Sequence, residues 1–269
     1  MIKVHLYTTD ISAFRLIKPI IGLYKITLVG VIVPKNRIKY KKVLDVISYC
    51  NKECINIITH GNDSDIIDFK GVDVAISWMY SQILPNSVLS KYPLGVLNMH
   101  GGFIPKYRGA NVLQWAIING DTEIGVTWHS MVEKVDAGPI FLETSVCIDK
   151  KMNALDVRSA QIDEGIKVFP IAWKNFLNLD FVAKIPNLGI GNVWKARVPK
   201  DGRIFSHYTK EKIFNTVRSL PYPWPPATIL VDNIWVPIKK IEKFKLDNTF
   251  TFLLDDSSEI FIVLENTKK

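Results

Sequence analysis

Hydrophobic residues in the first hundred positions follow two patterns that alternate along the chain. Continuous apolar or β-branched runs, typical of buried strands, lie at residues 2–7, 27–33, 56–59, 72–77 and 95–100. Between them, residues 12–21 and 41–51 space their apolar side chains as an amphipathic helix does, and Pro85 opens a short helix to residue 91. Strands that alternate with helices predict βαβ units, and hence an α/β fold with a Rossmann-like, mostly parallel sheet flanked by helices.

The following segments extend the same pattern. Residues 110–119 are predicted to form a helix, and residues 124–129 and 139–145 to form strands. A long helix to about residue 178 is expected after Asn153, which suits an N-cap position because an acid, Asp156, follows three residues later. No Gly-x-Gly-x-x-Gly motif follows the first strand, so the sequence does not predict a dinucleotide site.

The character of the chain changes after residue 179. Prolines and glycines mark a loop-rich crossing, which leads to a short helix at 210–220 and two hairpin patterns, 228–231 with 234–240 and 249–254 with 259–264. We therefore expect a catalytic domain at 1–179 and a small β-rich C-terminal domain at 180–269. Apolar strands of the second domain offer edges suited to pairing across a two-fold axis, which favours a homodimer.

Composition narrows the class of protein. Hydrophobic residues make up 48% of the 269 residues, enough for a sizeable core, but no apolar run approaches the length of a membrane span. An acid at Asp10 interrupts the N-terminus before a secretory signal develops. The three cysteines, Cys50, Cys54 and Cys147, form no disulfide framework or metal motif. These features predict a cytoplasmic protein with no membrane partner and no metal.

Positive charge is spread evenly. The net charge is +8, and the excess of basic over acidic residues is four in residues 1–179 and four in residues 180–269. A surface that binds nucleic acid concentrates Lys and Arg to meet phosphates. The even distribution therefore predicts no nucleic-acid partner.

Candidate chemistry gathers in residues 98–140. Asn98 and His100 end a predicted strand two residues apart, so both side chains point the same way. Asp136 follows in a loop after an intervening helix and strand. An amide that polarises a carbonyl, an imidazole base and a carboxylate that orients it form an acyl-transfer constellation without a nucleophilic side chain.

These three residues belong to a longer motif. Asn98-x-His100 is followed by Pro105-x-Tyr107-Arg108-Gly109, and His129-x-Met131 precedes Asp136-x-Gly138. In this spacing the chain resembles the formyltransferases that use 10-formyltetrahydrofolate. The resemblance implies catalytic roles for Asn98, His100 and Asp136, and a supporting role for His129.

The resemblance also implies where the folate donor binds. Related enzymes hold the pterin ring between a loop after an earlier strand and the loop that carries the aspartate. Here the corresponding residues are Trp78, Met79, Tyr80 and Ile83, together with Lys134, Val135 and Asp136. Apolar side chains such as Ile83 are expected to flank the flat ring.

The acceptor is predicted from one residue that departs from the family motif and from an aromatic turn in the additional C-terminal segment. Many members carry a serine where this chain has Gly102, whereas sugar-nucleotide formyltransferases often carry glycine there. We expect Gly102, Tyr107 and Arg108, and the aromatic residues of the turn Tyr222–Trp224, to contact the acceptor. The function predicted is transfer of a formyl group to a nucleotide-linked amino-dideoxy sugar, with dTDP as the first choice of nucleotide and GDP or UDP next, for O-antigen or another surface polysaccharide.

Three alternatives were weighed against this function. A methionyl-tRNA formyltransferase is disfavoured by the even charge. A folate-binding protein without turnover is disfavoured by the intact Asn98, His100 and Asp136. A glycinamide-ribonucleotide formyltransferase is disfavoured by the additional C-terminal segment. The nucleotide, the amino position on the sugar and the division of proton transfer between His100 and Asp136 remain open from sequence.

Overall fold

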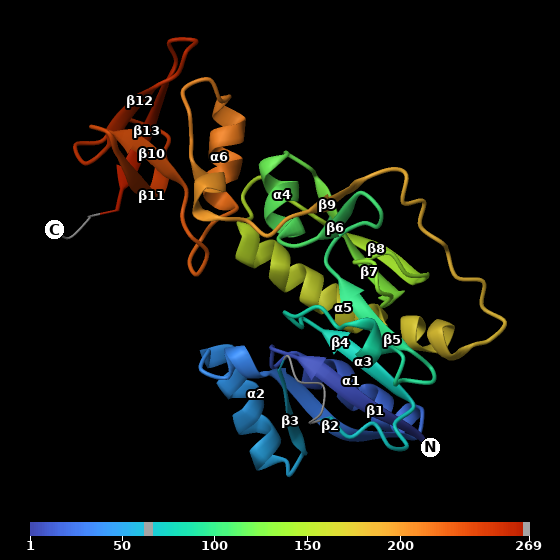
Figure 1. Cartoon of the computed structure of the whole chain (residues 1–269). Helices are drawn as coiled ribbons and strands as arrows, with labels where there is room; N and C mark the ends of the chain where they lie inside the picture. The colour runs from blue at the N-terminus through green and yellow to red at the C-terminus, as the bar shows by residue number, and fades with distance from the viewer. Residues whose placement is uncertain (62–66, 266–269) are drawn as a thin grey trace. The chain divides into compact units, whose positions relative to one another are not determined.

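A computed structural model describes residues 1–61 and 67–265 of the chain (Figure 1). These residues form two compact units. The first consists of residues 1–108, 125–144 and 162–192, and the second of residues 109–124, 145–161 and 193–269. The units are therefore assembled from interleaved segments, whereas the sequence predicts one boundary at residue 179, which stays a prediction.

The first unit contains a seven-stranded sheet in the order β3-β2-β1-β4-β5-β7-β8. Its strands are β1 (Ile2–Thr8), β2 (Ile26–Pro34), β3 (Ile57–His60), β4 (Val74–Trp78), β5 (Val96–His100), β7 (Glu123–Ser130) and β8 (Ile140–Cys147). The pairs from β3 to β5 are parallel, and β7 is antiparallel to β5. The prediction of a Rossmann-like, mostly parallel sheet is thus confirmed.

Helices accompany the strands as the periodicity predicts. They are α1 (Ala13–Leu23), α2 (Lys41–Lys52), α3 (Asn86–Leu89) and the long α5 (Ala154–Leu177), with a single 3-10 turn η1 (Lys35–Arg37) after β2. Helix α1 buries Phe14, Ile17 and Ile20, which lie on one face because they are three apart. None of the helices in the described part of the chain is long and apolar enough to cross a membrane.

The second unit has its own antiparallel sheet, in the order β10-β11-β13-β12, shown in orange and red in Figure 1. Its elements are α4 (Val112–Ile118), α6 (Lys210–Arg218), the 3-10 turn η3 (Pro199–Gly202), β10 (Thr228–Val231), β11 (Ile234–Glu242), β12 (Phe250–Leu253) and β13 (Glu259–Leu264). Asp232 and Asn233 both have positive φ, as the two-residue hairpin turn requires. Both predicted hairpins are present.

Two further features refine the prediction. The cap at Asn153 forms as expected: its side chain accepts from the backbone N–H of Leu155 and Asp156, and Asp156 accepts from the Asn153 N–H. The short strands β6 (Tyr107–Gly109) and β9 (Asn192–Trp194) were not predicted, because three residues are too few to show a period.

Parallel pairing brings the carboxyl ends of β1, β4 and β5 to one edge of the sheet. The strands pair in register, with Thr8 opposite Trp78 and Ser77 opposite Asn98. Loops that leave these strand ends therefore lie beside one another. In open α/β sheets this edge is where ligands bind.

A chain of buried polar groups lies within the apolar core of this sheet. Nδ1 of His5 lies 3.0 Å from the hydroxyl of Tyr92, which in turn lies 2.8 Å from the hydroxyl of Tyr7. Nε2 of His5 meets no hydrogen-bond partner among the described residues. Because a second proton there would be buried without an acceptor, burial lowers the pKa of His5 to about 4, against a smaller opposing effect of Asp68.

This shift predicts acid-sensitive stability. The folded pKa lies below the unfolded value of about 6.5, so the stability contributed by neutral His5 is present above pH 6.5 and is lost as pH falls toward 4. We expect the free energy of unfolding, measured with urea, to drop between pH 7.5 and 5, and to drop less in His5→Leu. An equal drop in both proteins would contradict this assignment.

Candidate functional site

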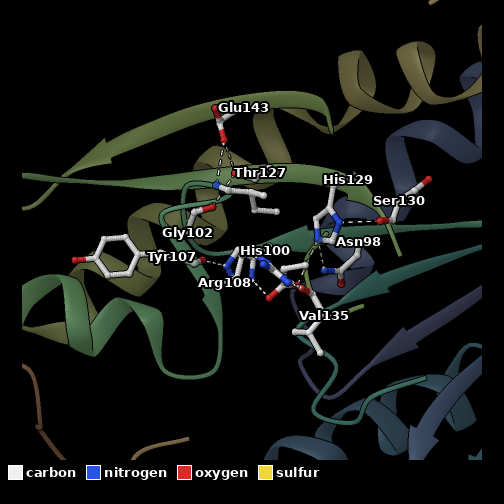
Figure 2. A network of polar contacts seen from close by, with 12 residues as sticks. Asn98, His100, Gly102, Tyr107, Arg108, Thr127, His129, Ser130, Val135 and Glu143 are labelled. Atoms are coloured by element: carbon white, nitrogen blue, oxygen red, sulfur yellow. Dashed lines mark hydrogen bonds and ion pairs between the residues drawn. The ribbon is translucent and has the colours of Figure 1, made fainter. Parts of the chain in front are cut away.

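Asn98 and His129 face each other across two strands. Asn98 on β5 pairs in register with His129 on the antiparallel β7, and its Nδ2 lies 3.1 Å from His129 Nε2 (Figure 2). His129 Nδ1 lies 2.8 Å from the carbonyl oxygen of Ser130, which can only accept a hydrogen bond. Nδ1 therefore carries the proton, and Nε2 accepts from the Asn98 amide. His129 thus fixes the orientation of Asn98, as its predicted supporting role requires.

His100 is held by a second carbonyl group. Its Nε2 lies 2.5 Å from the backbone oxygen of Tyr107, so Nε2 carries the proton in the neutral ring. Its Nδ1 lies 3.4 Å from Oδ2 of Asp136. The lone pair of His100 is consequently on the nitrogen that faces the carboxylate.

Burial and charge act against each other at His100. Burial, the larger effect, lowers the pKa of His100, whereas the nearby Asp136 carboxylate raises it. His100 is only 8% exposed, which makes the loss of hydration large. The neutral imidazole, with a free lone pair at Nδ1, is thus the form that the folded protein favours at neutral pH.

The loop that carries Asp136 is shaped by its backbone. Asp136 has φ +44°, a left-handed conformation that costs energy for a residue with a Cβ. A Cβ at Gly138 would lie 2.0 Å from the carbonyl oxygen of Ser130, so only glycine fits there. Arg108 is buried, and its Nε and Nη2 donate to the Val135 oxygen at 3.0 and 2.7 Å. These contacts place the Asp136 carboxylate between His100 and His129, with Oδ1 3.6 Å from His129 Nε2.

Gly102 packs against the catalytic candidate. A Cβ at this position would lie 2.7 Å from the Tyr107 oxygen and 2.9 Å from His100 Nε2, the two atoms that form the His100 hydrogen bond. Thr127 on β7 donates to the Gly102 oxygen at 2.7 Å. The glycine that departs from many formyltransferases is therefore required by this packing of His100.

Sequence reasoning did not identify Thr127 or Glu143. The Glu143 carboxylate accepts from the backbone N–H of Ile104, lies 3.3 Å from Thr127 Oγ1 and pairs with Lys184 at 3.0 Å (Figure 2). These contacts tie the loop after β5 to strands β7 and β8. No motif could have found them, because they depend on the register of strands that are far apart in the sequence.

The predicted folate loop, residues 78–83, has a mixed exposure. The Trp78 side chain is fully buried, donates to Ser12 Oγ at 2.8 Å and stacks on Trp128, so only its backbone can meet a ligand. Met79 has φ +52°, and its carbonyl accepts from Thr9 Oγ1. Ile83 is 72% exposed, and its role beside a flat ring stays a prediction.

The remaining predicted residues fall in different settings. Tyr107 is buried, and Figure 2 shows its ring directed away from His100, so its backbone oxygen is the part that contributes to the site. Lys134 is exposed, and it precedes Val135, whose carbonyl accepts from Arg108. The acceptor-binding roles of Gly102, Tyr107 and Arg108 stay predictions.

The aromatic turn lies in the second unit. Tyr222 is 90% exposed, which excludes it from the core, whereas Trp224 packs against the core of the antiparallel sheet. Both line a cavity of about 430 Å³ beside α6 and β11. Cations also line this cavity, namely Arg218, Lys239 and Lys240. Within the described ranges no cluster of His, Cys, Asp and Glu is arranged to hold a metal ion.

The packing around Gly102 yields a test that needs no assay of function. Gly102→Ala should lower the free energy of unfolding by about 1–3 kcal/mol, because the added Cβ forces the Tyr107 carbonyl and the His100 ring apart. Gly22→Ala in α1 is the matched control, since a Cβ there meets nothing within 4 Å. Urea unfolding measures both, and a Gly102→Ala protein as stable as wild type would refute the argument.

The segment that carries this site is similar in sequence to known proteins. Residues 60–172 match the family described as Formyl transferase. The bifunctional polymyxin resistance protein ArnA of Wigglesworthia glossinidia brevipalpis is 32% identical over 186 residues, which are 66% of this chain and 28% of ArnA. The chain thus aligns with little more than a quarter of the length of that relative.

Solved structures share the fold over nearly the whole chain. An N-formyltransferase from Helicobacter canadensis, in complex with folinic acid and dTDP-3-aminofucose, superposes with a TM-score of 0.70 at 18% identity, covering 98% of this chain and 100% of that one. Methionyl-tRNA formyltransferase from Clostridium thermocellum superposes with a TM-score of 0.60 at 15% identity, covering 98% and 99%. The segment that matches the formyl transferase family, residues 60–172, is the one that carries Asn98, His100 and Asp136.

Proposed function

We propose that this protein transfers a formyl group from 10-formyltetrahydrofolate to the amino group of a nucleotide-linked amino-dideoxy sugar. The observation that carries the proposal is the buried lone pair of His100, 3.4 Å from Asp136, on the same strand as the oriented amide of Asn98. These groups supply a base, its charge partner and a hydrogen-bond donor in one place.

The folate, when bound, supplies the formyl group on its N10 nitrogen. The reaction forms a bond between the acceptor nitrogen and the formyl carbon and breaks the bond from that carbon to N10. The formyl oxygen gains negative charge and the amine must lose a proton. One N–H of Asn98 is engaged by His129, which leaves the second to donate to this oxygen. A single donor of this kind lowers the barrier by about 3 kcal/mol.

Proton transfer is assigned to His100. Burial keeps its ring neutral before the reaction, and Nε2 is occupied by the Tyr107 carbonyl, so Nδ1 takes the proton of the amine. The imidazolium that results lies against the Asp136 carboxylate, which stabilises its charge. His100 can then return the proton to N10. In this proposal Asp136 stabilises the charged ring and does not itself abstract the proton.

The donor site is assigned to residues 78–83 and the Asp136 loop. Ile83 provides an exposed apolar side chain, and the left-handed conformations of Met79 and Asp136 set the direction of the backbone groups in the two loops. Such a combination of an apolar face and backbone polar groups suits a flat heterocycle. The folinic acid bound by the Helicobacter canadensis relative supports a folate donor.

A sugar nucleotide is preferred over tRNA as the acceptor. The fold alone does not decide, because sugar and tRNA enzymes share it. The even distribution of the +8 net charge disfavours tRNA, whose binding needs concentrated cations. The cavity of the second unit combines Tyr222 and Trp224 with Arg218, Lys239 and Lys240, which suits an aromatic base and its phosphates. Stacking on an aromatic side chain contributes about 1–3 kcal/mol per base.

The proposed oligomeric state rests on an edge strand of the antiparallel sheet, and the proposed location rests on the cysteines. We propose a homodimer through β10, because residues 229–231, predicted to offer an edge, lie in a strand at one end of the antiparallel sheet. The other predicted edge, residues 261–264, is wrong, because β13 is paired with both β11 and β12. The free thiols of Cys50, Cys54 and Cys147 fit a reducing compartment, which supports a cytoplasmic location. Production of a formamido sugar for a surface polysaccharide such as O-antigen is the biological role proposed.

The first test removes the catalytic groups. Asn98→Ala and His100→Ala should each lower turnover by at least about 10²-fold with the fold retained, because each removes a group used during bond formation. Formyl transfer from 10-formyltetrahydrofolate is measured by the absorbance change of the folate product. His207→Ala, at an exposed histidine of the second unit, is the control and should keep wild-type turnover. Near-normal rates in either catalytic variant would reject the assignment.

The second test selects the acceptor. Wild-type protein is assayed with a panel of dTDP-, GDP- and UDP-linked 3-amino and 4-amino sugars and with methionyl-tRNA. We expect a dTDP-amino sugar to have the highest kcat/KM, and Tyr222→Ala and Trp224→Ala to raise its KM. Formylation of methionyl-tRNA at an equal or higher rate would reverse the choice of acceptor, and an unchanged KM in both variants would remove the aromatic turn from the site.

A further inference from the structure

The loop at residues 78–83, here called the donor loop, is anchored to three neighbouring strands. Thr9, just after β1, donates to the Met79 carbonyl at 2.6 Å. Asn36, just after β2, accepts from Gln82 Nε2 at 2.9 Å. The third anchor is His60, the last residue of β3, whose Nδ1 lies 2.8 Å from the Tyr80 hydroxyl. The mechanism above uses none of these three contacts.

One tautomer of His60 satisfies both of its neighbours. Gln82 donates through Nε2 to Asn36, which leaves Gln82 Oε1 to accept a hydrogen bond. The Gln82 side chain also interacts with His60, and this contact by itself raises the pKa of His60. If the second ring nitrogen donates to this oxygen, Nδ1 accepts from the Tyr80 hydroxyl. Burial, the larger effect, lowers the pKa of His60, so the ring stays neutral and holds this arrangement.

Tyr80 is thereby fixed with its ring turned inward. The ring packs edge-to-face on Tyr7, with centroids 5.1 Å apart, while its hydroxyl reaches His60. The exposed Ile83 follows three residues later, directly after Gln82, whose side chain is held by Asn36. Fixing Tyr80 and Gln82 therefore sets the path of the backbone that presents Ile83.

We infer that His60 is a positioning residue for the donor loop, acting through Tyr80 and Gln82 to hold the loop in its folate-binding conformation. The inference rests on the proposed function, because it assigns the loop to the folate donor. A preorganised loop binds more tightly, since less conformational freedom is lost on binding. Loss of the anchor should weaken donor binding and leave the chemistry at His100 unchanged.

The test separates binding from turnover. His60→Leu should raise the KM for 10-formyltetrahydrofolate about ten-fold, with kcat within about two-fold of wild type. Tyr80→Phe should raise KM similarly, and the double variant should be no worse than the worse single one, because both remove the same contact. His60→Asn, which keeps a polar group near the Nδ1 position, should recover part of the loss.

The matched control is Tyr24→Phe, which removes another tyrosine hydroxyl contact in the same unit, Tyr24 to the Pro170 carbonyl, and should leave the KM unchanged. Calorimetric titration with 5-formyltetrahydrofolate measures donor binding without any acceptor. Folate that binds His60→Leu as tightly as wild type overturns the inference, as does a KM increase in Tyr24→Phe equal to that in Tyr80→Phe. Wild-type protein that binds this folate but formylates no acceptor rejects the proposed function, while the binding comparison still decides the role of His60. Wild-type protein that binds no folate rejects both.

Discussion

The site depends on one carboxylate that faces two imidazoles. Asp136 places Oδ2 3.4 Å from His100 and Oδ1 3.6 Å from His129, and both rings direct their protonated nitrogens to backbone carbonyls instead (Figure 2). The two carbonyls thus decide which nitrogens carry lone pairs. As a result His100 offers its lone pair next to a negative charge, where a proton taken up during reaction is stabilised.

That arrangement explains several residues whose own chemistry is unremarkable. Arg108 donates twice to the carbonyl of Val135, the residue before Asp136, and so supports the left-handed conformation of Asp136 that places the carboxylate. Gly102 and Gly138 leave space for atoms that any Cβ would displace. Arg108, Gly102 and Gly138 therefore contribute to the site through the backbone geometry that they permit or hold.

The sequence predicted what local patterns determine. Alternation on β5 put Asn98 and His100 on one side, and the Asp232-Asn233 pair marked a turn whose two residues have positive φ. It could not predict that the Trp78 side chain is buried against Trp128, because the last residue of a strand can turn to either face until its neighbours are known. Nor could it show that α5 begins in the second unit and ends in the first, because a boundary along the chain does not reveal interleaved segments.

The chemistry and the choice of acceptor are encoded in different parts of the chain. All groups assigned to bond making and to the donor lie in the first unit, at the edge formed by the carboxyl ends of β1, β4 and β5. The aromatic and cationic cavity assigned to the nucleotide lies in the second. The distances between catalytic groups must be held to within a few tenths of an ångström. A seven-stranded sheet with buried polar contacts provides this rigidity. A cavity lined by long lysines and an exposed tyrosine tolerates substitution, so changes there need not disturb the groups in the first unit.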